Sequence, residues 1–192
     1  MQDRKQELID AIIAYLLKHG LADMSLRPLA AKSGTSSRLL IYHFESKEGL
    51  LTEVLLAMQG RVRRSCEELL AKVARNRKGL VPLRLFWDWA TNAENFPYLK
   101  LLYELQILAI QNPSAYAKYL ADNSVNWLDF AMAAMSAEHR TPEFATLCGA
   151  VFDGLFLEFM STGDRKRTSQ ALQAFIRLAG GARDSSRRKS EV

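Results

Sequence analysis

Apolar residues recur at intervals of three and four along most of the chain, a spacing that places them on one side of an α-helix. The clearest case is residues 4–18, where charged residues separate the aliphatic ones Leu8, Ile9, Ile12, Ile13, Leu16 and Leu17. No segment of the sequence alternates apolar and polar residues as a half-buried strand does. The pattern predicts an all-α protein of about nine helices.

Short helices are predicted to form the N-terminal part of the chain. After the helix at 4–18, a second begins behind Ser25 and ends near Gly34, and Ser36 or Thr35 caps a third. The third is too short to be stable without packing. Because a short turn containing glycine joins the last two, residues 1–46 are predicted to be a helix-turn-helix domain.

The third helix has two different faces. Arg38 and Tyr42 are four residues apart and share one face, whereas Leu40 and Phe44 share the opposite face. The apolar face is suited to packing against the protein, which leaves the other face available to a partner.

A long connecting helix is predicted over residues 47–74. Ser46 is its expected cap, and Gly60 in its interior is expected to loosen or bend it. Three arginines of this helix are predicted to be solvated, and the alternative for them is contact with DNA or a partner. They are Arg61, Arg63 and Arg64.

Residues 75–181 are predicted to form a helical domain for effector binding and dimerisation. The helix predicted at 142–161 is apolar nearly all round, so it must be buried on several sides or meet a second subunit. Gly180 and Gly181 are expected to stop the last helix, and the basic tail at 182–192 is expected to be disordered. The last two helices of each of two chains would make a four-helix interface.

The charge is uneven along the sequence. The net charge is +5, and residues 24–47 carry Arg27, Lys32, Arg38 and Lys47 against Glu45 alone. This local surplus suits a polyanion, although a solvated surface would also explain it.

Composition argues against several other classes of protein. Cys66 and Cys148 have no CxxC partner or histidine cluster, so packing is expected of them rather than a disulfide or a metal site. No membrane span or signal segment is predicted, which indicates a cytoplasmic protein. No cofactor is expected, and no catalytic motif such as HExxH or GxSxG is present, so an enzyme is not expected.

The sequence YHF at Tyr42 to Phe44, followed by SKEGLL at Ser46 to Leu51, resembles that of TetR-family transcriptional regulators. The resemblance runs from Leu8 to about Leu55. Beyond residue 60 it rests on the layout of helices and on DGL at Asp153 to Leu155. It implies a helix-turn-helix, a long fourth helix and a ligand-responsive helical body.

The resemblance implies that Tyr42, His43 and Lys47 contact DNA phosphates. The chemistry agrees, because a hydroxyl, a ring N–H and an ammonium at a helix N-terminus all suit an anion. Ser25 and Arg27, at the start of the second helix, are predicted to contact the backbone as well.

Base reading is predicted for the third helix. Arg38 is suited to a bidentate contact with guanine, and Leu39 to packing on a thymine methyl. Leu39 stands where the family often has a small residue or threonine. The alternative to a DNA contact is, for Leu39, burial against the fourth helix and, for His43, a role as a structural cap. The predicted base-reading residues are Ser36, Ser37, Arg38 and Leu39.

The resemblance also implies a mostly apolar ligand cavity in the C-terminal domain, with ordinary core packing as the alternative for these aromatic residues. The predicted lining residues are Trp87, Trp89, Tyr103, Trp127, Phe130 and Phe156.

The sequence thus predicts a homodimeric transcriptional regulator that binds double-stranded DNA, and a repressor is expected. It would bind a palindromic operator and leave it when a small, largely apolar ligand enters the C-terminal domain. The alternative is a helix-turn-helix DNA-binding protein whose helical body serves dimerisation or protein partners and has no small-molecule effector.

Overall fold

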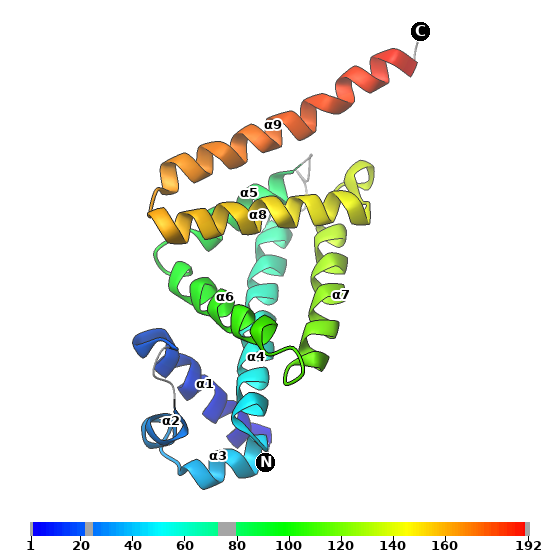
Figure 1. Ribbon diagram of the computed structural model, residues 1–192. Helices are drawn as coiled ribbons and strands as arrows, with labels where there is room; N and C mark the ends of the chain where they lie inside the picture. The colour runs from blue at the N-terminus through cyan, green and yellow to red at the C-terminus, as the bar shows by residue number, and fades with distance from the viewer. Residues whose placement is uncertain (1, 22–24, 73–79, 191–192) are drawn as a thin grey trace. The chain divides into compact units, whose positions relative to one another are not determined.

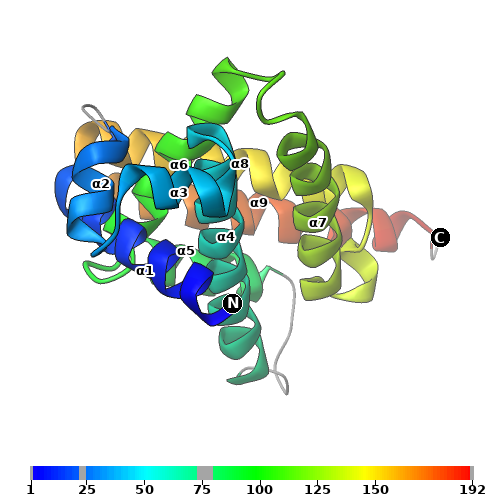
Figure 2. The same cartoon turned by 90° about the horizontal axis from the view of Figure 1, so that it is seen from below.

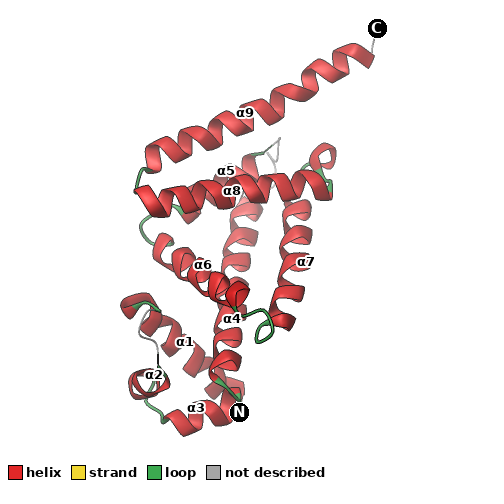
Figure 3. Cartoon of the chain, in the orientation of Figure 1, coloured by secondary structure: helices red, strands yellow, loops and turns green. Residues whose placement is uncertain are grey.

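The structure, a computed structural model, describes residues 2–21, 25–72 and 80–190. Within these ranges every regular element is a helix (Figure 3), as the sequence pattern predicts. The elements in chain order are α1 (Gln2–His19), α2 (Leu26–Lys32), α3 (Ser37–Phe44), α4 (Lys47–Lys72), α5 (Val81–Ala90), α6 (Phe96–Gln111), α7 (Ala117–Ala134), the 3₁₀ turn η2 (Ala137–His139), α8 (Pro142–Thr162) and α9 (Arg165–Ser190).

The chain forms two compact units that differ from the contiguous domains expected from the sequence. Unit 1 combines Met1–Ser65 with Glu94–Ser124, and unit 2 combines Cys66–Ala93 with Val125–Val192. The N-terminal helices therefore share a unit with α6, which contacts α1. Helical spacing shows which side of a helix is apolar but not which other helix covers it, so the sequence could not reveal this pairing.

The core of unit 1 is built largely from the predicted apolar stripes of α1 and α4. Each of these side chains is at most 4% exposed. They are Leu8, Ile9, Ile12, Ile13 and Leu16 on α1, and Leu50, Leu51, Val54, Leu55 and Met58 on α4.

Side-chain caps begin several helices, among them those predicted at Ser36 and Ser46. Ser25 is the exception, because it occupies the N-cap position of α2 with an extended backbone but makes no side-chain capping bond. The caps that are made, each as backbone N–H donor and side-chain acceptor, are Leu39 to Ser36 Oγ (3.2 Å), Gly49 to Ser46 Oγ (2.9 Å), Phe144 to Thr141 Oγ1 (3.2 Å) and Arg167 to Asp164 Oδ1 (2.9 Å).

The turn between α3 and α4 is unusually tight. Glu45 has φ 67° and ψ −43°, and the Ser46 N–H donates to the Phe44 carbonyl at 2.7 Å, which together define a γ-turn of the strained, positive-φ kind. A Cβ on Gly49 would lie 2.2 Å from that same Phe44 carbonyl oxygen. The first turn of α4 can therefore approach the end of α3 only because residue 49 has no side chain.

In unit 2, α8 and α9 lie side by side (Figure 1). Their core includes Cys148, which is 3% exposed, and Phe152 and Phe156 on α8. Burial raises the pKa of the Cys148 thiol to about 11 and, with a smaller effect of Glu67, that of Cys66 to about 12. Both thiols are thus protonated at neutral pH, in agreement with the packing role predicted for them.

The sequence pattern predicts a helix over residues 80–95 and, from Pro113, the start of another; both predictions misplace a boundary. Helix α7 begins at Ala117, because the preceding residues form a turn in which the Ala115 N–H donates to the Asn112 carbonyl. Helix α5 ends at Ala90. Helix α4 is continuous through Gly60 to Lys72, and the predicted residues 73 and 74 lie outside the described residues.

The prediction for the C-terminus was also wrong. Helix α9 runs through Gly180 and Gly181 to Ser190, where the sequence pattern predicted a stop and a disordered tail. A glycine costs a helix about 1 kcal/mol relative to alanine but does not block it sterically as proline does. Ala179 and Ala182, good helix formers on either side, favour continuation.

We predict that Gly49→Ala lowers the free energy of unfolding by roughly 1–3 kcal/mol, because the new methyl group must displace the Phe44 carbonyl. Gly180→Ala is the matched control. No atom lies within 4 Å of its added Cβ, so it should raise stability by up to about 1 kcal/mol. Urea unfolding followed by circular dichroism measures both, and equal effects of the two substitutions would contradict the assignment of the tight turn.

Candidate nucleic-acid interface

Helix α3 has one buried side and one exposed side, as predicted. Leu40 and Phe44 are 0% and 4% exposed and fix the helix to the core of unit 1. The helix lies at the lower edge of unit 1 in Figure 1, and it is in front when the molecule is seen from below in Figure 2. Its opposite side is therefore open to a partner.

Large side chains project from this open side. Tyr42 is 75% exposed and Leu39 is 49% exposed, and Arg38 is exposed beside them. The alternative that Leu39 is buried against α4 is thus wrong. This side of α3 therefore carries a basic, an apolar and an aromatic side chain together.

The serines before and at the start of α3 are partly committed to the fold. Ser36 Oγ accepts the capping bond from the Leu39 N–H, which leaves its hydroxyl proton free to be donated to another acceptor. Ser37 is half-buried. Both remain at the N-terminal end of α3, where a helix that enters a DNA groove makes its base contacts.

The remaining predicted phosphate contacts surround α3. The ring of His43 is half-buried, with its centroid 5.4 Å from that of Tyr42 and 6.3 Å from that of Phe44. Lys47 is the first residue of α4, where the partial positive charge of the helix end adds to its own. At the start of α2, Ser25 and Arg27 are exposed.

One exposed residue of α3 was not among the predicted contacts. Ile41 is 38% exposed, at the border between the buried and open sides. Ile41 is next to Tyr42 in the sequence and does not share the helix side of Leu40 and Phe44. This spacing could have indicated from the sequence that Ile41 is exposed.

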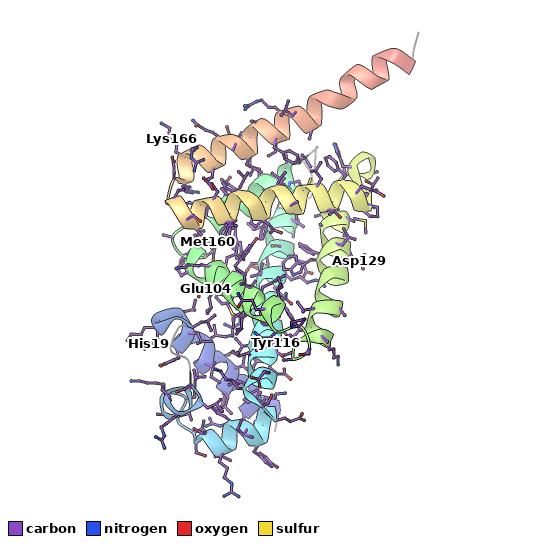
Figure 4. All side chains as sticks on the ribbon, viewed as in Figure 1. His19, Glu104, Tyr116, Asp129, Met160 and Lys166 are labelled. Atoms are coloured by element: carbon purple, nitrogen blue, oxygen red, sulfur yellow. The ribbon has the colours of Figure 1, made fainter. Side chains whose placement is uncertain are left out.

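A buried tyrosine of unit 1 lies near the start of α4. Tyr116, in the turn before α7, is 4% exposed and labelled beside α4 in Figure 4. Burial raises the pKa of its hydroxyl, and the nearby carboxylate of Glu48 on α4 raises it further.

The predicted ligand residues occupy different environments. Tyr103 belongs to α6 in unit 1, whereas the other five lie in unit 2. Trp87 is 1% exposed and its indole N–H donates to Ser169 Oγ at 2.9 Å, so it is a satisfied core residue, and Phe156 is 0% exposed. Half-buried side chains with surface available to a ligand are Trp89, Trp127 and Phe130.

Aromatic rings in unit 2 form a stacked series. Phe86 of α5 stacks on Trp89 at 5.7 Å and on Phe152 of α8 at 4.6 Å, and Phe152 stacks on Phe156 at 5.8 Å. The rings cover one another's faces, and Phe152 and Phe156 are buried, so the series is part of the core of unit 2. Around it, Asp129 and Lys166 are exposed and point outward (Figure 4).

Comparison with known proteins identifies the N-terminal helices. Residues 8–54 match the sequence model of the family described as "Bacterial regulatory proteins, tetR family". The HTH-type transcriptional regulator BetI of Brucella anthropi is 24% identical over 177 residues, which cover 88% of each chain.

Solved structures extend the similarity over most of the chain. A putative transcriptional regulator from Pseudomonas aeruginosa PAO1 superposes with a TM-score of 0.69 at 26% identity, covering 94% of this chain and 92% of that one. The multidrug binding protein EbrR, complexed with imidazole, superposes with a TM-score of 0.61 at 23% identity over 91% of this chain and 90% of its own. The N-terminal helices are therefore those of the tetR family of bacterial regulatory proteins, and the chain as a whole is similar to helix-turn-helix transcriptional regulators.

Proposed function

We propose that the protein is a homodimeric, cytoplasmic repressor that binds a palindromic operator and is released from it by a small, largely apolar ligand. The observation that carries the DNA-binding half is the open side of α3, where Arg38, Leu39 and Tyr42 are exposed while Leu40 and Phe44 are buried. A helix anchored in this way can enter the major groove without any loss of its own packing.

The exposed side chains divide into two roles. Arg38 would bind guanine through both of its terminal nitrogens, and Leu39 would pack on a thymine methyl group. Ser36 and Ser37 would donate hydroxyl protons to bases next to them. The residues that would hold phosphates, without reading sequence, are Ser25, Arg27, Tyr42, His43 and Lys47.

An exposed stripe on α8 supports the homodimer. Leu147 is 49% exposed and Leu157 is 54% exposed, and the exposed Ala150 and Gly154 lie between them at helical spacing. The small residues permit close approach of another helix. A two-fold interface on this stripe would cover the apolar side chains and give the symmetry that a palindromic operator requires.

Length and composition alone would also let α8 cross a membrane. Its most apolar window has a mean hydropathy of 1.4 and is 28% buried. Asp153, however, lies exposed near the middle of this helix, where a charge in a bilayer costs at least about 2.5–3.5 kcal/mol. A protein interface, with water at its rim, accommodates this carboxylate better.

A flat apolar ligand is supported by the aromatic side chains of unit 2. Trp89, Trp127 and Phe130 are half-buried, and Phe86 forms part of a stacked series. A similar fold binds such a compound in EbrR, which has been crystallised in complex with proflavin. Trp87 and Phe156 would support the lining from behind, because both are buried in the core.

The first test separates base reading from phosphate binding. Arg38→Ala should lower the ratio of specific to nonspecific affinity by about tenfold, because it removes one bidentate contact. Lys47→Ala should weaken both duplexes alike and lower the slope of log affinity against log salt by about one. Fluorescence polarisation with the DNA upstream of the encoding gene and with a random duplex measures both.

Arg84→Ala is the control for this test, since it removes the same charge from the exposed surface of α5. Its affinity for both duplexes should equal that of the parent. If Arg38→Ala and Lys47→Ala also bind as the parent does, the interface is not on α3.

Leu157→Asp should convert a dimer into a single chain of 21.7 kDa at micromolar concentration, because it places a charge in the proposed interface. Ile110→Asp is the matched control, as Ile110 is 57% exposed on α6. Light scattering coupled to size exclusion gives the mass. A parent that is already monomeric, or a Leu157→Asp variant that stays dimeric, would show that α8 is not the interface.

Proflavin should quench the tryptophan emission of the DNA-free protein in a saturable way, because all three tryptophans lie in unit 2 among the proposed lining residues. Phe130→Ala should weaken binding by up to about tenfold through the loss of one ring contact. Free tryptophan amide titrated in parallel corrects for collisional quenching. Quenching that never saturates would favour a helical body without a small apolar effector.

A further inference from the structure

A polar groove in unit 1 lies away from α3 and is not used in the proposed function. Its volume is about 360 Å³, at the lower end of the range for small-molecule sites. Helices α1 and α4 provide its walls, and the lining that matters here consists of Gln6, Asp10, Gly60, Arg61 and Arg64.

One arginine of the groove is already paired across the two helices. Arg61 on α4 donates through Nη2 to Asp10 Oδ1 on α1, and Gln6 Nε2 donates to the same oxygen at 2.8 Å. Both charged side chains remain partly exposed, at 37% for Arg61 and 50% for Asp10. The pair therefore fixes one guanidinium at the edge of the groove.

The second arginine has no such partner. Among the residues that the structure describes, no carboxylate lies within ion-pair distance of Arg64. Its Nη1 lies 3.6 Å from the position that a Cβ on Gly60 would take, so the guanidinium folds back over the glycine. With Asp10 compensating Arg61, the groove keeps a net positive charge from Arg64.

A buried hydroxyl lies behind the same arginines. Tyr98 Oη on α6 is buried, and Arg61 interacts with it through its charge and a side-chain hydrogen bond. Burial raises the pKa of Tyr98 to about 12, while Arg61 and the charge of Arg64 act to lower it and the charge of Asp10 raises it. The hydroxyl is thus protonated at neutral pH, and its proton remains available because a guanidinium can only donate to it.

We propose that this groove binds a small anion that carries a carboxylate or phosphate group, with Arg64 as the principal contact and Arg61 as the second. Guanidinium groups bind such oxyanions through paired, charge-assisted hydrogen bonds. The bound anion contacts α4 through both guanidinium groups and lies beside the wall that α1 provides.

DNA phosphate does not explain the two arginines. Arg64 follows Lys47 by 17 residues on one continuous helix, which places it about 25 Å along α4 from the proposed DNA contact. The carboxylate of Asp10, at the edge of the groove, also repels the neighbouring phosphates of a polyanion. A single small oxyanion has no such neighbours and fits between the guanidinium groups.

The test uses inorganic phosphate and succinate in separate titrations of the DNA-free, full-length protein, each at constant ionic strength set with sodium chloride. Arg64→Gln removes the principal contact. Arg63→Gln is the matched control, because Arg63 is the preceding exposed arginine of α4 and is not part of the groove lining. Isothermal calorimetry gives the affinity, and the unfolding temperature gives an independent measure.

We expect saturable binding of at least one of the two anions by the parent. The affinity should be about tenfold weaker in Arg64→Gln and within about twofold of the parent in Arg63→Gln. Binding of phosphate but not succinate assigns the groove to phosphate compounds, and the reverse assigns it to carboxylates.

Two results would overturn the proposal. One is the absence of saturable binding of either anion at millimolar concentration. The other is an equal gain in unfolding temperature for the parent, Arg64→Gln and Arg63→Gln, since phosphate stabilises many proteins simply by exclusion from their surface.

Discussion

The DNA-binding half of this regulator depends on the tight turn between α3 and α4. Glu45 adopts a backbone conformation that costs a non-glycine residue about 1–3 kcal/mol. Two interactions offset that cost: the cap that Ser46 Oγ accepts from the Gly49 N–H, and the burial of Phe44. Because Gly49 has no side chain, α4 can begin directly against the Phe44 carbonyl. The direction in which α4 leaves α3 is therefore set locally, before any longer-range packing contributes.

The burial of two side chains determines which side of α3 is open. A helix of eight residues has almost no stability of its own, so it exists because Leu40 and Phe44 are buried. Once these two are in the core, the helical repeat leaves Arg38 and Tyr42 no position except the open side. The exposure of Leu39 and Tyr42 is thus a consequence of core packing, and the proposed reading face needs no separate structural support.

Local chemistry made the helices and their caps predictable from the sequence, whereas longer-range packing did not. Ser36 and Ser46 were recognisable as caps because the N–H that each accepts lies three residues further along the chain. Trp87 and Phe156 were predicted as cavity lining but are buried, because helical spacing does not distinguish a core ring from one that faces a ligand. The Asp10–Arg61 pair joins residues 51 positions apart, and no local pattern signals such a contact.

Helix α4 belongs to both units and carries the two arginines of the proposed anion site. It contributes Lys47–Ser65 to unit 1 and its last turns to unit 2. Gly60 lies shortly before that junction, where it lowers the intrinsic stability of the helix by about 1 kcal/mol. Arg61 and Arg64 hold the adjoining turn, one through Asp10 and the other over the glycine itself. An anion that restrains both arginines would stiffen α4 next to Gly60.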